Sequence, residues 1–116
     1  MKVTRIDPDE TSEQIAVVQY CALKGIPVAH VPNEGKRSVV YGARLKEMGL
    51  SCGFPDLVIP EPRKGYHGIL IEMKTRTGKA TEDQMKWLSR LSNSGYLAAL
   101  CHGFEEAREI IDEYFG

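Results

Sequence analysis

Apolar residues follow two different spacings along this chain, and the helical spacing comes first. Ile15, Val18 and Ala22 recur every three or four residues, which is typical of one side of an amphipathic helix. Gly25 provides a stop signal just after this stretch. We therefore predict a helix over about residues 12–24, with those three side chains facing the core.

Two helix starts have the spacing of a capping box, in which a Ser or Thr side chain and a Glu or Gln three residues later satisfy backbone N–H groups reciprocally. Thr11 with Gln14 is the first pair, and Thr81 with Gln84 is the second. We predict an amphipathic helix after each pair. The apolar face expected for the second helix consists of Met85, Leu88 and Leu91.

The apolar runs in the middle of the chain are short and rich in β-branched residues, which indicates strands. Residues 56–59 and 68–74 are two such runs, and the segment between them contains Pro and Gly. These features predict an antiparallel hairpin. Its open end would place Asp56 near Glu72 in space.

The remaining segments complete an alternation of helices and strands. We predict a strand over residues 28–31, a helix over residues 36–48, a buried strand over residues 96–101 and a final helix over residues 104–114. The predicted order is helix, strand, helix, two strands, helix, strand, helix. At 116 residues, the chain is the size of one α/β domain, so we expect residues 1–116 to form a single functional unit.

The composition is that of a globular protein, with 42% hydrophobic and 27% charged residues. The sequence has neither an apolar run long enough to cross a membrane nor a secretory signal pattern, so we expect a cytoplasmic protein that is not secreted. Cys21, Cys52 and Cys101 lack the spacing of a disulfide framework or a zinc site, and we expect buried or idle thiols.

Charge is distributed unevenly along the chain. Residues 36–90 contain 11 Lys and Arg against 6 Asp and Glu, whereas both flanking segments are net negative. A basic segment with clustered acids suits a polyanion held near a metal ion, although a solvated mixed-charge surface has the same composition. The side chains that are candidates for contacting the phosphates of such a polyanion are Lys36, Arg37, Arg44, Lys46, Arg76 and Lys79.

The hairpin carries the residues that point most clearly to chemistry. Side chains alternate along a strand, so Glu72 and Lys74 share one face. Carboxylates of Asp56 and Glu72, with a backbone carbonyl such as that of Met73, would suit Mg²⁺ or Mn²⁺ and leave positions open for water and phosphate. The alternative is an exposed ion pair between Glu72 and Lys74, with Asp56 in an ordinary turn.

Several segments around these residues form a recognisable set of motifs: Ser12-Glu13-Gln14, His30-Val31-Pro32-Asn33-Glu34-Gly35, Gly53-Phe54-Pro55-Asp56-Leu57, Ile71-Glu72-Met73-Lys74, Gly78, Gln84 with Trp87, and Gly95-Tyr96. In these segments the chain resembles the VRR-NUC family, the virus-type replication-repair nucleases, in a small stand-alone form. The resemblance implies the PD-(D/E)XK fold of restriction endonucleases, an α/β core with a central mixed β-sheet flanked by helices.

The resemblance also implies roles for individual residues. It makes Asp56 and Glu72 metal ligands, Lys74 the catalytic lysine, Gln84 an active-site residue and Glu13 an accessory acid near the metal. Without it, Gln84 would be expected to cap its helix, and Glu13 could equally be a first-turn acid favoured by the helix dipole.

Two aromatic residues within the resemblance have structural roles as their default. For His30 we favour a structural hydrogen bond over a role as general base. Trp87 lies at the edge of its helix's apolar face, where core packing is the expected role.

The function implied by the resemblance is Mg²⁺- or Mn²⁺-dependent cleavage of DNA. For stand-alone members it implies a homodimer acting on branched DNA, such as four-way (Holliday) junctions or flaps, in DNA repair or in a viral context within a bacterial or virus-infected host cell. Two alternatives remain open at this stage: a DNA-binding module without catalysis, and a nuclease that cuts a specific duplex sequence or RNA.

Overall fold

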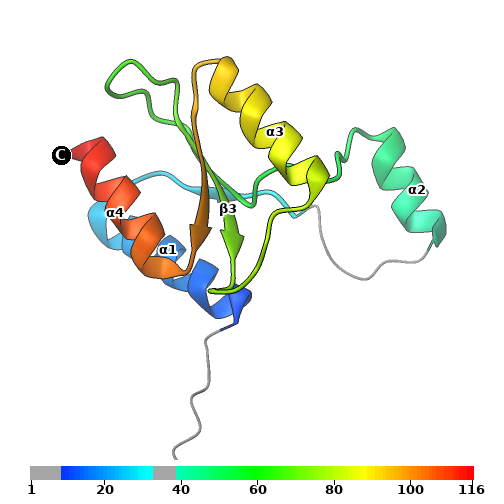
Figure 1. Cartoon of the computed structure of the whole chain (residues 1–116), viewed down its shortest axis with the longest axis horizontal. Coiled ribbons are helices and arrows are strands. Elements are labelled where there is room, and N and C mark those ends of the chain that lie inside the picture. Colours follow the sequence, from blue (N-terminus) through cyan, green and yellow to red (C-terminus); the bar gives the residue numbers. More distant parts are fainter. Residues whose placement is uncertain (1–8, 33–38) are drawn as a thin grey trace, which may run out of the picture.

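The computed structural model describes residues 9–32 and 39–116 (Figure 1). Its helices and strands follow the order predicted from the sequence. They are α1 (Glu10–Lys24), β1 (Ala29–His30), α2 (Val39–Glu47), β2 (Leu57–Ile59), β3 (Ile69–Lys74), α3 (Glu82–Asn93), β4 (Leu97–His102) and α4 (Phe104–Phe115). The start predicted for the second helix, at residue 36, lies outside the described residues.

The four described strands form one mixed sheet in the order β1-β2-β3-β4. β1 pairs with β2 and β2 with β3 in antiparallel fashion, whereas β3 and β4 are parallel. The predicted hairpin is thus confirmed, with Leu57 opposite Ile71 and Ile59 opposite Ile69. This α/β architecture, a mixed sheet flanked by helices, is the predicted fold class.

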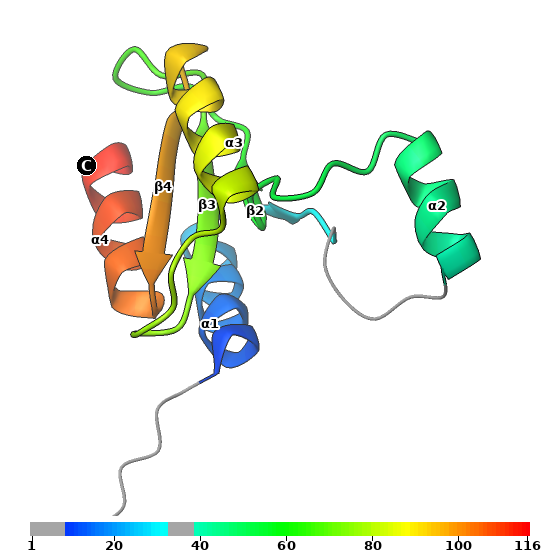
Figure 2. The same ribbon diagram turned by 45° about the vertical axis from the view of Figure 1, so that its right-hand side comes forward.

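Helices cover both faces of the sheet. α1 and α4 lie side by side against one face, and α3 lies against the other (Figures 1 and 2). Val17, Ile69, Ile71 and Ile111 belong to the core between the sheet and the α1–α4 layer, and each has no exposed surface. β3 is the central support of the molecule, because its first five residues are all buried.

The face that α1 turns inward differs from the predicted one. Val17 and Cys21 are fully buried, whereas Ile15 is 52% exposed and Val18 is 37% exposed. α1 has apolar side chains on both of these faces, and packing against β3 and α4 decides which of them is buried. The prediction that Ile15, Val18 and Ala22 face the core was therefore wrong.

The start of α1 also differs from prediction. The helix begins at Glu10, and its N-cap is Asp9, whose carboxylate accepts a hydrogen bond from the Ser12 N–H at 2.7 Å. An Asp at this position satisfies a backbone donor that has no partner within the helix. The helix is already in progress at Thr11, so the predicted first capping box does not form.

The second predicted capping box is confirmed at the start of α3, but the apolar face is only partly as expected. Thr81 is the N-cap, and Gln84 completes the box. Met85 is 54% exposed, while Trp87 and Leu88 are half-buried. The inward face of α3 is thus rotated from Met85 toward Gln84 and Trp87.

α2 stands apart from the sheet and its covering helices (Figures 1 and 2). The described side chains of α2 are exposed or half-buried, and Tyr41 is 57% exposed. Met48, directly after the helix, is 77% exposed. An apolar pocket between this region and α3 is lined by Val31, Leu45, Met48, Leu50, Phe54 and Trp87.

No helix in the described parts of the chain is long and apolar enough to cross a membrane. The three cysteines are free thiols, of which Cys21 and Cys101 are buried and Cys52 is exposed. Burial, aided by the nearby charge of Glu106, raises the pKa of the Cys101 thiol to about 12. Such a thiol remains protonated and is a poor nucleophile.

Candidate metal centre

Three carboxylates from three separate elements converge at one end of the β2–β3 hairpin. Glu10 comes from the first turn of α1, Asp56 directly precedes β2, and Glu72 lies within β3. One oxygen of each lies within 4.8 Å of the other two. Asp56 is 3% exposed and both carboxylate oxygens of Glu72 are buried, so this is an internal cluster of acids rather than a solvated acidic face.

The hairpin register explains why Asp56 meets Glu72. Leu57 lies opposite Ile71, and the next step along the antiparallel pair brings Asp56 opposite Glu72. The Met73 N–H donates a hydrogen bond to Asp56 Oδ2 at 2.8 Å. The Asp56 side chain is therefore fixed by the backbone of the neighbouring strand, at the point where β2 has ended.

The Met73 carbonyl points toward the same side. In a strand, the N–H and C=O of one residue point in the same direction, and successive residues alternate. The carbonyls of Gly68 and Lys74 accept hydrogen bonds from Leu97 and Gly103, on the β4 side. Met73 therefore directs its carbonyl away from β4, toward the end of β2 where Asp56 lies.

The loop before Asp56 is held tightly against α3. Gly53 has a φ of +87°, and a Cβ placed there would lie 2.7 Å from the Asp83 backbone carbon. Only glycine combines this left-handed conformation with such a close approach. The next residue, Phe54, packs edge-to-face on Trp87 with ring centroids 5.0 Å apart. These contacts fix the position of Asp56 relative to α3, and they agree with the packing role expected for Trp87.

Gln84 lies at the start of α3 and is 3% exposed. Its side-chain oxygen accepts a hydrogen bond from the Thr81 backbone N–H at 2.8 Å, and the backbone N–H of Gln84 donates to Thr81 Oγ1 at 3.2 Å. The capping role expected from the sequence is therefore present. This role uses the carboxamide oxygen, so the capping box does not involve the carboxamide nitrogen.

The structure does not bring Glu13 into the acid cluster. Glu13 Oε2 accepts a hydrogen bond from the Phe104 N–H at 2.6 Å. Phe104 opens α4, whose N-cap is Gly103 and makes no side-chain cap bond. Glu13 thus caps α4 from a neighbouring helix, and the α1 acid in the cluster is Glu10, which the sequence interpretation missed. The available signal was spacing: Glu10 lies seven residues before the buried Val17, on the inward face of α1.

His30 has the structural role that the sequence favoured. Its Nδ1 lies 2.9 Å from the backbone oxygen of Asp56 and 3.0 Å from the Gln14 side-chain nitrogen. The Val31 N–H donates to the same oxygen at 2.8 Å. Both contacts hold the backbone of a residue in the acid cluster.

The basic candidates are distributed around the cluster rather than within it. Lys74 ends β3 on the same face as Glu72 and is half-buried. Arg76 and Lys79 are exposed on the loop that follows. Arg44 and Lys46 lie on α2, where Arg44 forms an exposed ion pair with Glu47 at 3.4 Å. Lys36 and Arg37 lie outside the described residues.

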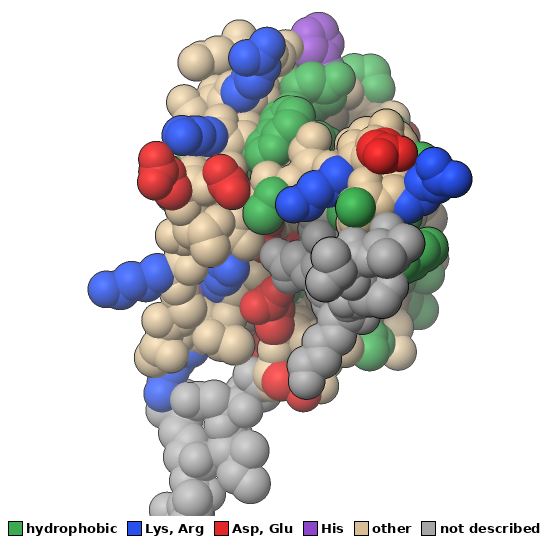
Figure 3. All heavy atoms as spheres, turned by 90° about the vertical axis from the view of Figure 1, so that its right-hand side faces the viewer, with side chains coloured by type: hydrophobic (Ala, Val, Ile, Leu, Met, Phe, Trp, Pro, Cys, Tyr) green, Lys and Arg blue, Asp and Glu red, His purple; other side chains and the backbone are tan. Residues whose placement is uncertain are grey.

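This arrangement gives the molecule a face with acids between bases. Figure 3 shows acidic side chains near the centre of that face, with Lys and Arg side chains to their left and above them. Such a pattern can hold a cation at the centre and a polyanion across it.

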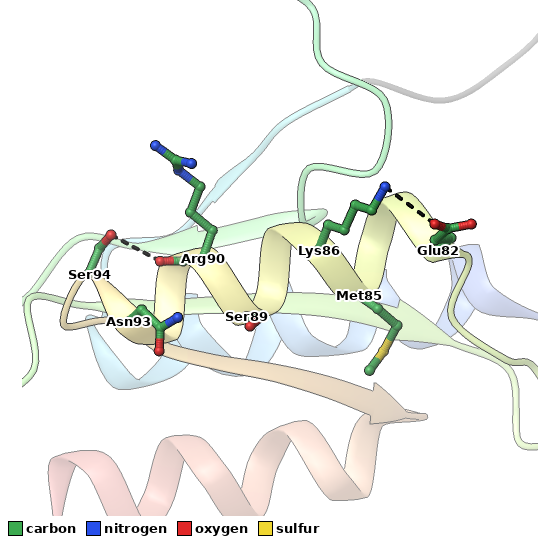
Figure 4. Close-up of a pocket in the computed structure, with 7 residues that line it drawn as sticks. All are labelled: Glu82, Met85, Lys86, Ser89, Arg90, Asn93 and Ser94. Atoms are coloured by element: carbon green, nitrogen blue, oxygen red, sulfur yellow. Dashed lines mark hydrogen bonds and ion pairs between the residues drawn. The ribbon is translucent and has the colours of Figure 1, made fainter.

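A separate hollow follows the outer surface of α3 (Figure 4). It is open, all of its lining residues come from α3 and the residue after it, and none belongs to the acid cluster. Lys86 and Glu82 within it form an exposed ion pair at 3.3 Å. The hollow has no convergent buried polar groups, so the acid cluster is the stronger candidate for the functional site.

The cluster has the donor set of a hard-cation site. Carboxylate oxygens are the ligands that Mg²⁺, Mn²⁺ and Ca²⁺ prefer. Three negative charges held this close, two of them buried, are strongly unfavourable unless a cation or protons offset them. The geometry therefore defines a class of protein, an α/β fold with a cluster of carboxylates that could hold a divalent cation at the end of a hairpin.

Comparison with known proteins names the family. The VRR-NUC domain matches residues 9–105, and the chain therefore belongs to the VRR-NUC family of nucleases. A solved structure described as a VRR_NUC domain protein has a TM-score of 0.81 and 27% sequence identity, covering 95% of this chain and 90% of that one. None of the curated proteins matches the chain. The resemblance inferred from the sequence motifs is confirmed.

Proposed function

We propose that this protein is a metal-dependent deoxyribonuclease in which residues 1–116 act as one nuclease domain. The observation that carries the proposal is the convergence of Glu10, Asp56 and Glu72 within 4.8 Å, at the end of the strand that also carries Lys74. Membership of a nuclease family and the excess of bases around the acids support a polyanionic substrate.

The proposed ligands for Mg²⁺ or Mn²⁺ are the three carboxylates and the Met73 carbonyl. Glu10 replaces Glu13 in this role, because Glu13 caps α4. When bound, the cation supplies Lewis-acid polarisation of the scissile phosphate and increases the acidity of a water molecule. The hydrogen bond from the Met73 N–H keeps one Asp56 oxygen occupied and orients the other.

Lys74 and Gln84 have the remaining proposed roles in catalysis. Lys74 shares a strand face with Glu72, so its ammonium group orients the attacking water or offsets the negative charge that develops on the phosphate. The Gln84 carboxamide nitrogen acts as a hydrogen-bond donor in the active site, while its oxygen remains in the capping box.

The basic side chains of α2 and of the loop after β3 are proposed to contact the DNA backbone. Arg44, Lys46, Arg76 and Lys79 contact phosphates without reading sequence, and we propose the same for Lys36 and Arg37. This recognition mode suits a branched substrate such as a four-way junction or a flap, whose shape differs from linear duplex. A sequence-specific duplex or RNA is the alternative substrate for the same chemistry.

A homodimer is the proposed active form on branched DNA, because a substrate with two-fold symmetry matches two sites related by a C2 axis. The exposed apolar side chains Tyr41 and Met48, around α2, support an interface there. Sedimentation should show a dimer for wild type and a monomer for Met48→Glu. A monomer for wild type, with and without junction DNA, would remove the dimer from the proposal.

We also propose that the protein acts in the cytoplasm of a bacterial or virus-infected cell, in DNA repair or viral replication. The three free cysteines support a reducing compartment.

The experiment that tests the nuclease proposal compares labelled four-way junction, flap, linear duplex and single-stranded DNA, each with Mg²⁺, Mn²⁺ or EDTA. Cleavage should require metal and should be lost in Lys74→Ala. Symmetric cuts in the junction would support a dimeric junction-resolving enzyme. Binding without cleavage on every DNA would contradict the proposal and favour a DNA-binding module, with RNA cleavage assayed in parallel to test the alternative substrate.

A further inference from the structure

His102, at the end of β4, is hydrogen-bonded to the loop that follows β3. Its Nε2 lies 2.8 Å from the Gly78 carbonyl oxygen. Because a carbonyl oxygen only accepts, the proton of this bond belongs to Nε2. The side chain therefore joins two segments that are 24 residues apart in the sequence.

The His102 ring is itself held in place from the other side. The backbone N–H of His102 donates to Glu106 Oε1 at 2.8 Å, and the same oxygen lies 3.6 Å from the ring Nδ1. In addition, His102 is the parallel register partner of Lys74. The ring position is thus defined by the sheet and by the first turn of α4.

The loop over residues 75–80 is folded back onto the end of β3. The Gly78 N–H donates to the Thr75 carbonyl at 3.1 Å, which closes a turn. A Cβ at Gly78 would lie 3.0 Å from Thr75 Oγ1 and 3.4 Å from Lys74 Cβ, so only glycine fits without displacement. The turn and the hydrogen bond to His102 together fix the path of a short loop between β3 and α3.

This loop carries the two exposed bases that are nearest in sequence to Lys74, namely Arg76 and Lys79. We propose that His102 is a positioning residue for substrate binding: by holding the Gly78 carbonyl, it keeps the loop in the conformation in which these two side chains meet phosphates of the DNA. The inference rests on the proposed function, because it assumes that DNA is the substrate. It assigns no role in the chemical step to His102.

Two substitutions separate the hydrogen bond from the bulk of the side chain. The Gln amide nitrogen in His102→Gln can take the place of Nε2, whereas the shorter Asn in His102→Asn reaches only the place of Nδ1. Both variants are polar, neutral and similar in size, so a general effect on folding should be common to both. Only His102→Asn should release Gly78.

Binding of fluorescent four-way junction is measured by anisotropy in EDTA, which removes metal binding from the readout. His102→Asn should raise the Kd about fivefold and reduce the salt slope by about one phosphate contact. His102→Gln should remain within about twofold of wild type by the same reasoning. In Mn²⁺, His102→Asn should raise KM while kcat at saturating DNA stays the same.

Lys79→Ala shows whether His102 acts through the loop. Alone it should weaken binding to a similar extent, but combined with His102→Asn it should add little, because the contact has already been lost. Amide hydrogen exchange over residues 75–80 should be faster in His102→Asn than in wild type and unchanged in His102→Gln.

Three outcomes would each overturn the inference while leaving the nuclease proposal intact. The first is an equal loss of DNA affinity in His102→Gln and His102→Asn, and the second is a double variant in which the effects of His102→Asn and Lys79→Ala on Kd multiply. The third is a loss of activity confined to kcat. If the wild-type chain bound no DNA in any condition, both proposals would be overturned.

Discussion

The β2–β3 hairpin and helix α2 are opposites within one small molecule. The first five residues of β3 are buried, and among them Glu72 has no exposed surface. α2 stands away from the sheet, with Tyr41 more than half exposed. The difference indicates a division of labour: a rigid strand pair holds the proposed ligands at fixed distances, while the protruding helix offers surface to a partner or substrate.

The largest expected effect comes from removing the charge of Asp56, next to the rigid β2–β3 hairpin. Asp56→Asn keeps an oxygen that can accept the Met73 N–H, so the fold should persist, yet it removes one ligand charge. DNA cleavage should fall by about a thousandfold or more, as expected when a cation site is disabled. Lys46→Ala on α2 is the control, and its rate at saturating DNA should match wild type. Cleavage assays measure the activity of both variants, and circular dichroism checks that both are folded. Equal activity of Asp56→Asn and Lys46→Ala would contradict the division of labour between the hairpin and α2.

The second test is core packing. Ile71→Ala deletes a fully buried side chain from β3 and should lower the free energy of unfolding by about 3 kcal/mol. In the monomer, Met48→Ala, beside α2, removes a side chain that is 77% exposed and should change the free energy of unfolding by less than about 0.5 kcal/mol. Urea denaturation measures both. Comparable losses would show that the α2 region packs as tightly as the hairpin.

Two glycines provide a matched pair with opposite expected signs. Gly53→Ala places a Cβ 2.7 Å from the Asp83 backbone at a φ of +87°, so it should destabilise by about 2 kcal/mol and slow cleavage by displacing Asp56. Gly42→Ala, in α2, meets nothing within 4 Å and should stabilise by about 0.5–1 kcal/mol because alanine favours helix. Thermal unfolding of both variants provides the measurement. A stabilising Gly53→Ala would show that the loop before Asp56 is not held against α3.

The smallest expected effect concerns Glu13, the acid that was expected near the metal but lies outside the acid cluster. Glu13→Gln weakens the cap on α4, whose Gly103 supplies no side chain, and should cost about 1 kcal/mol in the free energy of unfolding. Cleavage at saturating Mn²⁺ should remain unchanged. A loss of cleavage without a loss of stability would return Glu13 to the active site.

Much of the hairpin side of the molecule could be predicted from sequence, because strand alternation has a period of two and leaves few choices. That rule placed Glu72 and Lys74 on one face, the predicted hairpin placed Asp56 near Glu72, and the observed register agrees. The capping box of Thr81 and Gln84 was equally local and was also confirmed. Such features depend on neighbours in the sequence.

The rotation of α1 could not be predicted in the same way. α1 has apolar side chains on two faces, and only packing against β3 and α4 decides that Val17 and Cys21 are buried. That rotation also decides which acid faces the site, since Glu10 lies on the same side as Val17 whereas Glu13 reaches α4. One tertiary choice thus accounts for two differences from the sequence interpretation, the buried face of the helix and the acid that lies in the cluster.

The most direct test of the account is titration calorimetry of Mn²⁺ into wild type, Glu10→Gln and Glu13→Gln. The account predicts a Mn²⁺ site in wild type that is retained in Glu13→Gln and is lost or at least about tenfold weaker in Glu10→Gln. Unchanged affinity in Glu10→Gln, or a loss confined to Glu13→Gln, would contradict a metal centre built from Glu10, Asp56 and Glu72.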